Sequence, residues 1–369
     1  MKKTLLITYF FPPAIGGIEN YYLNFCGRLK PEEIVVLAQN QADTSVFDSN
    51  LPYHIYRTDF FGGKIPPRWL KLKKEIRQII KNENIEQIIF GHFHPLTFLG
   101  RDFSLPYYLF GHGTDITQIK NYFWQKMIFR RVYSGAQKII ANSNFLAQQI
   151  KALIGQNDKV EVIYPGIDFD GLNQPTPDFE ARKKALDINE NDLVLLSLGR
   201  LVPEKNLSAV LRVLPALLNI TSRIKYLIVG EGPDLPNLKA LVESSALGYK
   251  VKFIGAVANT PPAKAFYYQL ADLFIVPSLK PEGFGIAYLE AQAVGAPVIA
   301  SKFGGSSEAV KDNETGILVD PTSQEEIYRA LYTLITDSAK RQQMSAAGKI
   351  WAKEFSWERQ MEKIKEILG

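Results

Sequence analysis

Short apolar runs alternate with longer segments of helical pattern along nearly all of this 369-residue chain. Most runs lack strict apolar–polar alternation, which is typical of parallel strands covered by helices on both faces. The rhythm of strand and helix occurs twice, so we expect an α/β protein with two Rossmann-like, doubly wound parallel-sheet domains facing across a cleft. The expected strands are Leu5–Tyr9, Ile34–Ala38, Gln87–Phe90, Tyr107–Leu109, Lys138–Ala141 and Val160–Tyr164, then Leu193–Leu198, Tyr226–Val229, Val251–Ile254, Leu273–Val276, Pro297–Ala300 and Gly316–Val319.

The segment Pro165–Asp178 is the best candidate for a domain boundary, because it holds three prolines, two glycines and several turn formers. The chain length also suits two domains of ordinary size. We therefore predict two domains, an N-terminal one over residues 1–168 and a C-terminal one over residues 169–369. The final helix, Ser356–Leu368, is expected to pack back on the N-terminal domain.

Composition excludes several other classes of protein. A net charge of +5 spread along the chain is too weak for a nucleic-acid partner, and one cysteine, Cys26, excludes an internal disulfide framework. No apolar run approaches the roughly 18–20 residues that span a bilayer. The apolar start is followed at once by Pro12-Pro13 and a glycine pair, so we interpret it as the first strand of a cytoplasmic protein rather than a signal peptide.

Motifs that follow strands deserve most weight, since ligands of open α/β sheets bind beyond the carboxyl ends of the strands. Gly16-Gly17 precedes a helix, where the backbone can approach an anion closely; a tight turn is the alternative. Arg200 and Lys205 follow a strand and precede a helix, and a guanidinium with an ammonium suits a diphosphate. Two solvated surface cations are the alternative.

Two glutamates enclose a glycine-rich turn that follows another strand. Glu282 lies in the loop and Glu290 roughly one turn inside the next helix, and both can accept hydrogen bonds from sugar or ribose hydroxyls. Free N–H groups at the helix start near Gly285 would face a phosphate. His112 stands between two glycines at a strand end, which favours an exposed, ligand-facing histidine over a core one.

Several patterns are weaker. Asp168-Phe169-Asp170 matches an Asp-x-Asp metal pattern but lies in the expected linker, and His92 and His94 have no nearby ligand to complete a metal shell. Gly230-Glu231-Gly232 lacks the third glycine of a dinucleotide site, and Gly62-Gly63-Lys64 lacks the Ser or Thr of a phosphate-binding loop. We expect no metal site and no cofactor.

Together these residues resemble the retaining glycosyltransferases of family 4, which have the two-domain GT-B fold. The resemblance covers nearly the whole chain, and the stretch Gly285–Ala293 is similar to the subgroup of GDP-mannose-dependent phosphatidylinositol mannoside mannosyltransferases. Phe284 and Ala287 depart from it, because many members have Leu and Val there. The matching motifs are Pro12-Pro13-x-x-Gly16-Gly17, His112-Gly113-x-Asp115, Ala141-Asn142-Ser143, Pro165-Gly166-Ile167-Asp168, Gly199-Arg200-Leu201-x3-Lys205-Asn206, Gly230-x-Gly232-Pro233 and Glu282-x7-Glu290.

The resemblance implies that residues 1–168 form the acceptor-binding domain and residues 169–369 the nucleotide-sugar-binding domain. It also implies a role for each site residue. Arg200 and Lys205 would neutralise the donor's diphosphate without a metal, Glu282 would bind hydroxyls of the transferred sugar, and Glu290 would hold the ribose. His112 would contact the donor sugar near the reacting centre. The remaining donor contacts implied are Gly16 and Gly17, the loop around Val257 for the base, and the backbone N–H groups of Phe284, Gly285 and Ile286.

Function and partners follow as expectations. The chain should move a hexose, with mannose from GDP-mannose as first choice and a UDP-sugar as the alternative, to a lipid-linked or glycan acceptor. Basic amphipathic segments at Pro67–Lys81 and Tyr122–Tyr133 suit peripheral contact with an anionic membrane at the inner face of the cell membrane; an apolar face packed on the sheet is the ordinary explanation. A nucleotide-sugar epimerase and a non-catalytic nucleotide-sugar-binding paralogue are the alternatives of other classes.

Overall fold

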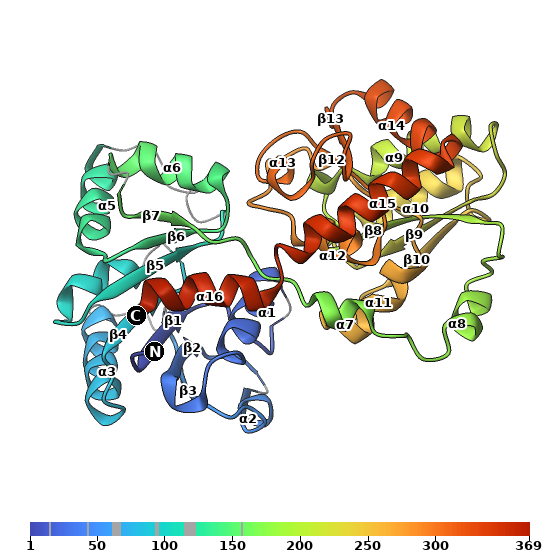
Figure 1. The fold of residues 1–369 in the computed structure, drawn as a ribbon. Coiled ribbons are helices and arrows are strands. Elements are labelled where there is room, and N and C mark those ends of the chain that lie inside the picture. Colours follow the sequence, from blue (N-terminus) through green and yellow to red (C-terminus); the bar gives the residue numbers. More distant parts are fainter. Residues whose placement is uncertain (15, 43, 61–67, 93–95, 114–122, 156–157) are drawn as a thin grey trace. The chain divides into compact units, whose positions relative to one another are not determined.

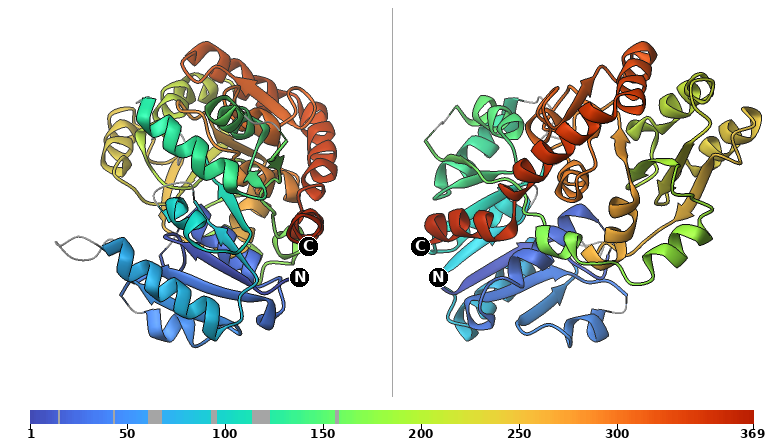
Figure 2. Two further views of the ribbon diagram at one scale, coloured as in Figure 1. Left: turned by 90° about the vertical axis from the view of Figure 1, so that its left-hand side faces the viewer. Right: turned by 45° about the vertical axis from the view of Figure 1, so that its right-hand side comes forward.

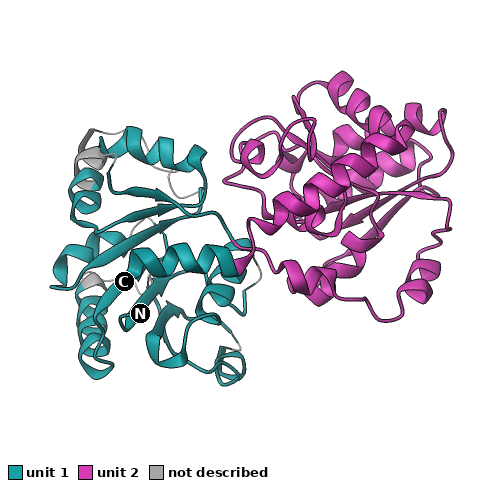
Figure 3. Cartoon of the chain, in the orientation of Figure 1, with its two compact units in different colours: residues 1–165, 358–369 teal, residues 166–357 magenta. Residues whose placement is uncertain are grey.

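A computed structural model describes residues 1–14, 16–42, 44–60, 68–92, 96–113, 123–155 and 158–369. The chain forms two compact units (Figure 3), of which the first comprises Met1–Pro165 and Glu358–Gly369 and the second Gly166–Trp357. The first crossing between units lies just before the boundary predicted after Asp168. The final helix, α16 (Trp357–Leu368), belongs to the first unit from Glu358 onward.

A parallel sheet forms the centre of the first unit (Figure 1). Its order in the described residues is β3-β2-β1-β4-β5-β6-β7, and every adjacent pair is parallel. The order in which the strands are added therefore reverses between β1 and β4. Doubly wound sheets bind their ligands at such a switch point. The strands are β1 (Thr4–Thr8), β2 (Ile34–Gln39), β3 (His54–Thr58), β4 (Gln87–Phe90), β5 (Tyr107–Gly111), β6 (Ile139–Ala141) and β7 (Val160–Val162).

The sheet of the second unit repeats this arrangement with six strands in the order β10-β9-β8-β11-β12-β13, again all parallel. Its switch point lies between β8 and β11. The prediction of two doubly wound parallel sheets is confirmed. The strands are β8 (Leu193–Leu198), β9 (Ile224–Val229), β10 (Val251–Gly255), β11 (Leu273–Val276), β12 (Val298–Ser301) and β13 (Gly316–Val319).

Helices cover both faces of each sheet (Figure 2). In the first unit, one face packs against α3, α5 and α6, whose buried Leu72, Phe129 and Ile150 join Leu5 and Val35 of the strands in one core. In the first unit the helices are α1 (Gly17–Cys26), α2 (Thr44–Asp48), α3 (Arg68–Asn82), α5 (Phe123–Gly135), α6 (Asn144–Ile154) and α16.

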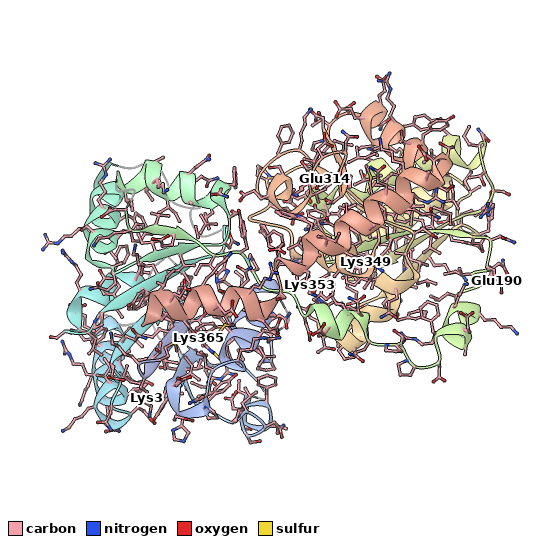
Figure 4. All side chains as sticks on the ribbon, viewed as in Figure 1. Lys3, Glu190, Glu314, Lys349, Lys353 and Lys365 are labelled. Carbon is pink, nitrogen blue, oxygen red and sulfur yellow. The ribbon has the colours of Figure 1, made fainter. Side chains whose placement is uncertain are left out.

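The second unit carries α7 (Phe169–Asn173), α8 (Phe179–Ala185), α9 (Leu207–Leu218), α10 (Leu235–Ser244), α11 (Pro261–Leu270), α12 (Ile286–Val294), α13 (Ser306–Ala309), α14 (Gln324–Thr336) and α15 (Ser338–Lys353). Exposed lysines mark the solvent faces of the two C-terminal helices of the chain, α15 and α16. They are Lys349 and Lys353 on α15 and Lys365 on α16 (Figure 4). Helix α16 buries Met361, Ile364 and Leu368 at helical spacing, so it is held by one apolar stripe.

Strand β3 is absent from the strands expected above, and its position explains why. It pairs only with β2 among the described strands and lies at the edge of the sheet. Its residues, from His54 to Thr58, are half-buried or exposed, and Arg57 forms an ion pair with Asp48. An edge strand with one polar side gives no continuous apolar run.

Candidate active site

The second unit contains a pocket at the carboxyl ends of β8 and β11, next to the switch point of its sheet. Position and lining agree with the general rule for ligand sites in open α/β sheets. Two cations, Arg200 and Lys205, contribute to it. The lining residues are Ser197, Leu198, Gly199, Arg200, Leu201, Lys205, Leu207 and Val276.

The two cations differ in their surroundings. Arg200 is exposed, and its guanidinium makes no hydrogen bond or ion pair with any described residue, so it is available to an anion. Lys205 ends a short 3₁₀ helix, Pro203–Lys205, and its Nζ lies 2.8 Å from Oε1 of Glu282. Lys205 keeps further donor capacity, because an ammonium carries three N–H groups.

Glu282 is half-buried and is contacted on one oxygen only. Its Oε1 accepts from Lys205 and from Ser278 Oγ at 2.5 Å, and Tyr288 Oη lies 3.2 Å away. Burial raises the pKa of Glu282, but the Lys205 charge and these hydrogen bonds outweigh it, so the pKa falls below its usual value. The carboxylate is therefore ionised at neutral pH. No described residue binds Oε2, which leaves it able to accept a hydrogen bond from a ligand hydroxyl.

Backbone hydrogen bonds fix the loop that carries Glu282. On one side, Leu279 N donates to Glu204 O at 2.7 Å, which joins this loop to the turn bearing Lys205. On the other side, Gly305 N donates to Glu282 O at 2.8 Å. A Cβ on Gly305 would lie 2.2 Å from Gly283 O, so only glycine permits this close approach. The Lys205–Glu282 pair is held by three segments far apart in the sequence.

Helix α12 begins directly after this loop. Gly285 is its N-cap, with a φ of 98°, and no described residue accepts a hydrogen bond from the N–H groups of Gly285 or Ile286. These two N–H groups are among those expected to contact a phosphate at the start of the helix. The Phe284 side chain is part of the core, since its ring packs 5.6 Å from that of Phe355. Only its backbone remains a candidate for ligand contact.

Glu290 lies one turn further along α12 and is almost fully buried. Lys264 forms an ion pair with its Oε1, and Tyr268 donates to its Oε2 at 2.7 Å. Both partners come from α11, which follows the loop containing the half-buried Val257. Sequence reasoning missed Lys264 and Tyr268. A lysine within Pro261–Leu270 has no local signal that separates it from a solvated one.

In the first unit, His112 is half-buried rather than exposed as expected, because Tyr21 and Tyr22 pack edge-on against its ring at 4.9 and 5.1 Å. Tyr22 Oη donates its proton to Gly91 O at 2.7 Å, so His112 Nε2, also 2.7 Å away, must donate to Tyr22. Nδ1 then carries the lone pair. Burial lowers the pKa of His112 to about 3, so the ring is neutral at physiological pH and can accept a hydrogen bond from a hydroxyl.

The remaining motifs take structural places. Gly16 caps α1 and Gly17 begins it, and a Cβ on Gly17 would meet open space. Asp168 accepts from Gly171 N and so caps α7 rather than lying in a linker. Among the described residues no cluster of three metal-ligating side chains occurs. His94, Asp115 and Gly62-Gly63-Lys64 lie outside the described residues.

Two family models match successive parts of the chain. "Glycosyltransferase Family 4" matches residues 15–170, and "Glycosyl transferases group 1" matches residues 178–351. With two doubly wound sheets and a cationic pocket at the edge of the second, the chain belongs to the glycosyltransferases of GT-B fold.

Known relatives and structures agree with this class. The GDP-mannose-dependent alpha-(1-6)-phosphatidylinositol monomannoside mannosyltransferase of Mycobacterium tuberculosis is 29% identical over all of this chain and 98% of its own length. A D-inositol 3-phosphate glycosyltransferase of Rhodococcus opacus is 32% identical over 62% of this chain and 52% of its own. The crystal structure of Anabaena Alr3699/HepE in complex with UDP has a TM-score of 0.84 at 21% identity, covering 100% of this chain and 99% of that one.

Proposed function

We propose that this glycosyltransferase transfers mannose from GDP-mannose to a lipid-linked or glycan acceptor, with retention of anomeric configuration and without a metal. The observation that carries the proposal is the pocket lined by Arg200 and Lys205, with Glu282 paired to Lys205, in a chain similar from end to end to GDP-mannose-dependent mannosyltransferases. A UDP-sugar is the second candidate donor, because Anabaena Alr3699/HepE, a protein of the same fold, has been crystallised with UDP and with UDP-glucose.

The proposed chemistry assigns a task to each group. Arg200 and Lys205 stabilise the negative charge that develops on the diphosphate as the bond from the anomeric carbon to the phosphate oxygen breaks. Glu282 Oε2 accepts a hydrogen bond from a hydroxyl of the transferred sugar. The acceptor hydroxyl attacks from the face that the diphosphate leaves, and its proton passes to the leaving phosphate oxygen. This route accounts for retention without a protein nucleophile.

A binding panel tests the donor. Titration of the protein with GDP, UDP, ADP and their sugars should raise the melting temperature most with GDP and GDP-mannose. At about 100 times the dissociation constant, a ligand that binds only the folded state stabilises it by about 2.7 kcal/mol. For a unit of the size of Gly166–Trp357, this should raise the melting temperature by about 5–10 °C. A larger rise with UDP than with GDP would favour a UDP-sugar over GDP-mannose as the donor. Stabilisation without transfer to any acceptor would favour the non-catalytic alternative.

We also propose peripheral contact with an anionic membrane through helix α3. The apolar face of α3 is not available to lipid, because its Leu72, Ile76 and Ile79 are buried in the core of the first unit. The opposite face exposes Lys71, Lys74, Arg77 and Lys81 together with Leu70. The side chains of Trp69, Phe123 and Trp124 lie outside the described residues. No helix in the described residues is long and apolar enough to cross a bilayer.

Such contact would be electrostatic, so salt should weaken it. We expect the protein to float with vesicles containing anionic lipid at low salt and to be released at about 1 M salt, where the Debye length is about 3 Å. Charge reversal of Lys71 and Lys74 to Glu should reduce flotation, whereas reversal of the exposed Lys239 of the second unit should not. Equal flotation with neutral and anionic vesicles would contradict the proposed electrostatic contact of α3 with the membrane.

A further inference from the structure

The environment of Glu290 is unusual for a residue that only packs a helix. Just 10% of its side chain and 5% of that of Lys264 are exposed, and the two are joined as an ion pair. Tyr268, fully buried, donates to the other oxygen at 2.7 Å. A pair of apolar side chains would hold α11 against α12 at least as well, since buried ion pairs seldom improve stability over well-packed hydrophobic residues.

The geometry leaves the carboxylate oriented but not saturated. Lys264 and Tyr268 lie four residues apart on one face of α11 and take one oxygen each. A carboxylate offers about four acceptor sites, so each oxygen of Glu290 retains capacity for one more donor. With both oxygens held by a rigid helix, the remaining lone pairs have fixed directions, as recognition of two neighbouring hydroxyl groups requires.

The position of α11 connects this carboxylate to the rest of the donor site. The helix starts at Pro261, directly after the loop that follows β10 and contains Val257, while Glu290 lies on the helix that starts beside Glu282. Helix α11 therefore begins at the loop expected to hold the base. Through Lys264 and Tyr268 it also holds the carboxylate expected to bind the ribose.

We propose that Lys264 and Tyr268 are positioning residues that orient Glu290 toward the 2′- and 3′-hydroxyls of the donor's ribose. They thereby set a preference for ribonucleotides over 2′-deoxyribonucleotides. The inference rests on the proposed function, because it requires that a nucleoside diphosphate bind this unit. It assigns to Lys264 no contact with the sugar or with the diphosphate.

The test compares GDP with 2′-deoxy-GDP, and UDP with 2′-deoxy-UDP, by calorimetric titration of the full chain. One hydrogen bond to a charged group corresponds to about a tenfold change in affinity, so the wild-type protein should bind the ribo form about tenfold more tightly. In Lys264→Met, which keeps the length of the side chain but not its charge, the ratio should fall below about threefold. Affinity for the deoxy form should fall less than affinity for the ribo form, because the deoxy form keeps only the contact at the 3′-hydroxyl. Lys239→Met, at an exposed lysine of α10, should keep the wild-type ratio.

A purely structural role of Lys264 would give a different result. Both nucleotides would then weaken together and their ratio would persist, which overturns the inference. If Lys264→Met does not fold, Tyr268→Phe decides: it removes one hydroxyl from the buried site and should lower the ratio by a smaller amount, and an unchanged ratio counts against the proposal. Equal wild-type binding of the ribo and deoxy forms also overturns it while the proposed function stands. Absence of any nucleoside diphosphate binding would reject both.

Discussion

Replacement of Arg200 or Lys205 by Ala should lower kcat/KM by about 10²–10³-fold, the usual effect of removing one electrostatic contact to developing charge. The Arg200 guanidinium makes no hydrogen bond or ion pair with a described residue, so its loss removes a cation from the pocket and breaks no side-chain contact. Loss of Lys205 also leaves Glu282 with its Oε1 bound only to neutral groups. We therefore expect Lys205→Ala to raise the pKa of Glu282 and to shift the acid limb of the pH–rate profile upward.

Steady-state kinetics with the preferred donor measures these effects. Arg212→Ala and Lys239→Ala are matched controls, because both remove an exposed cation from a helix of the same unit. They should leave kcat/KM within twofold of the wild type. If the two cations do the work of a metal, EDTA should leave wild-type turnover intact. Unchanged turnover in Arg200→Ala or Lys205→Ala, or loss of turnover on chelation, would refute the assignment.

The sequence predicts the parts of the fold that are buried. Gln87–Phe90, Leu193–Leu198 and Leu273–Val276 have the bounds expected for them, because a strand covered on both faces is a continuous apolar run. The edge strand β3 has no such run and could not be found this way. Residues that follow strands could likewise be located, because parallel strands bring their carboxyl ends to one edge.

Pairing between distant residues could not be predicted. Sequence spacing places Lys205 and Glu282 after neighbouring strands, but it does not indicate that one oxygen of Glu282 is occupied and the other open. The contacts of Glu290 with Lys264 and Tyr268 depend on how α11 packs against α12, which no local pattern encodes. The tautomer of His112, which directly follows β5, depends in the same way on Tyr22 of α1.

Gly230→Ala should both destabilise the second unit and disable the pocket. Gly230 follows β9, and its N–H donates to Gly255 O at 2.8 Å. Its φ is 136°, and an added Cβ would lie 1.9 Å from Gly199 O, the carbonyl that precedes Arg200. The oxygen in conflict with the added Cβ belongs to the backbone, so relief requires the Arg200 loop to move away from β9. Strain and displacement together should cost about 2–4 kcal/mol.

Two other glycines separate the causes. Gly199→Ala has a positive φ of 148° but open space around the added Cβ, so strain alone should cost about 1–2 kcal/mol. Gly248→Ala has neither problem and should stay within about 0.5 kcal/mol of the wild type. Urea denaturation gives the stabilities, and titration with the preferred nucleoside diphosphate gives the affinity. We expect Gly230→Ala alone of the three to lose at least about tenfold in affinity, because only there does a backbone conflict force the cation loop from its place. Equal affinity in Gly230→Ala and Gly248→Ala would mean that the diphosphate does not bind at this loop.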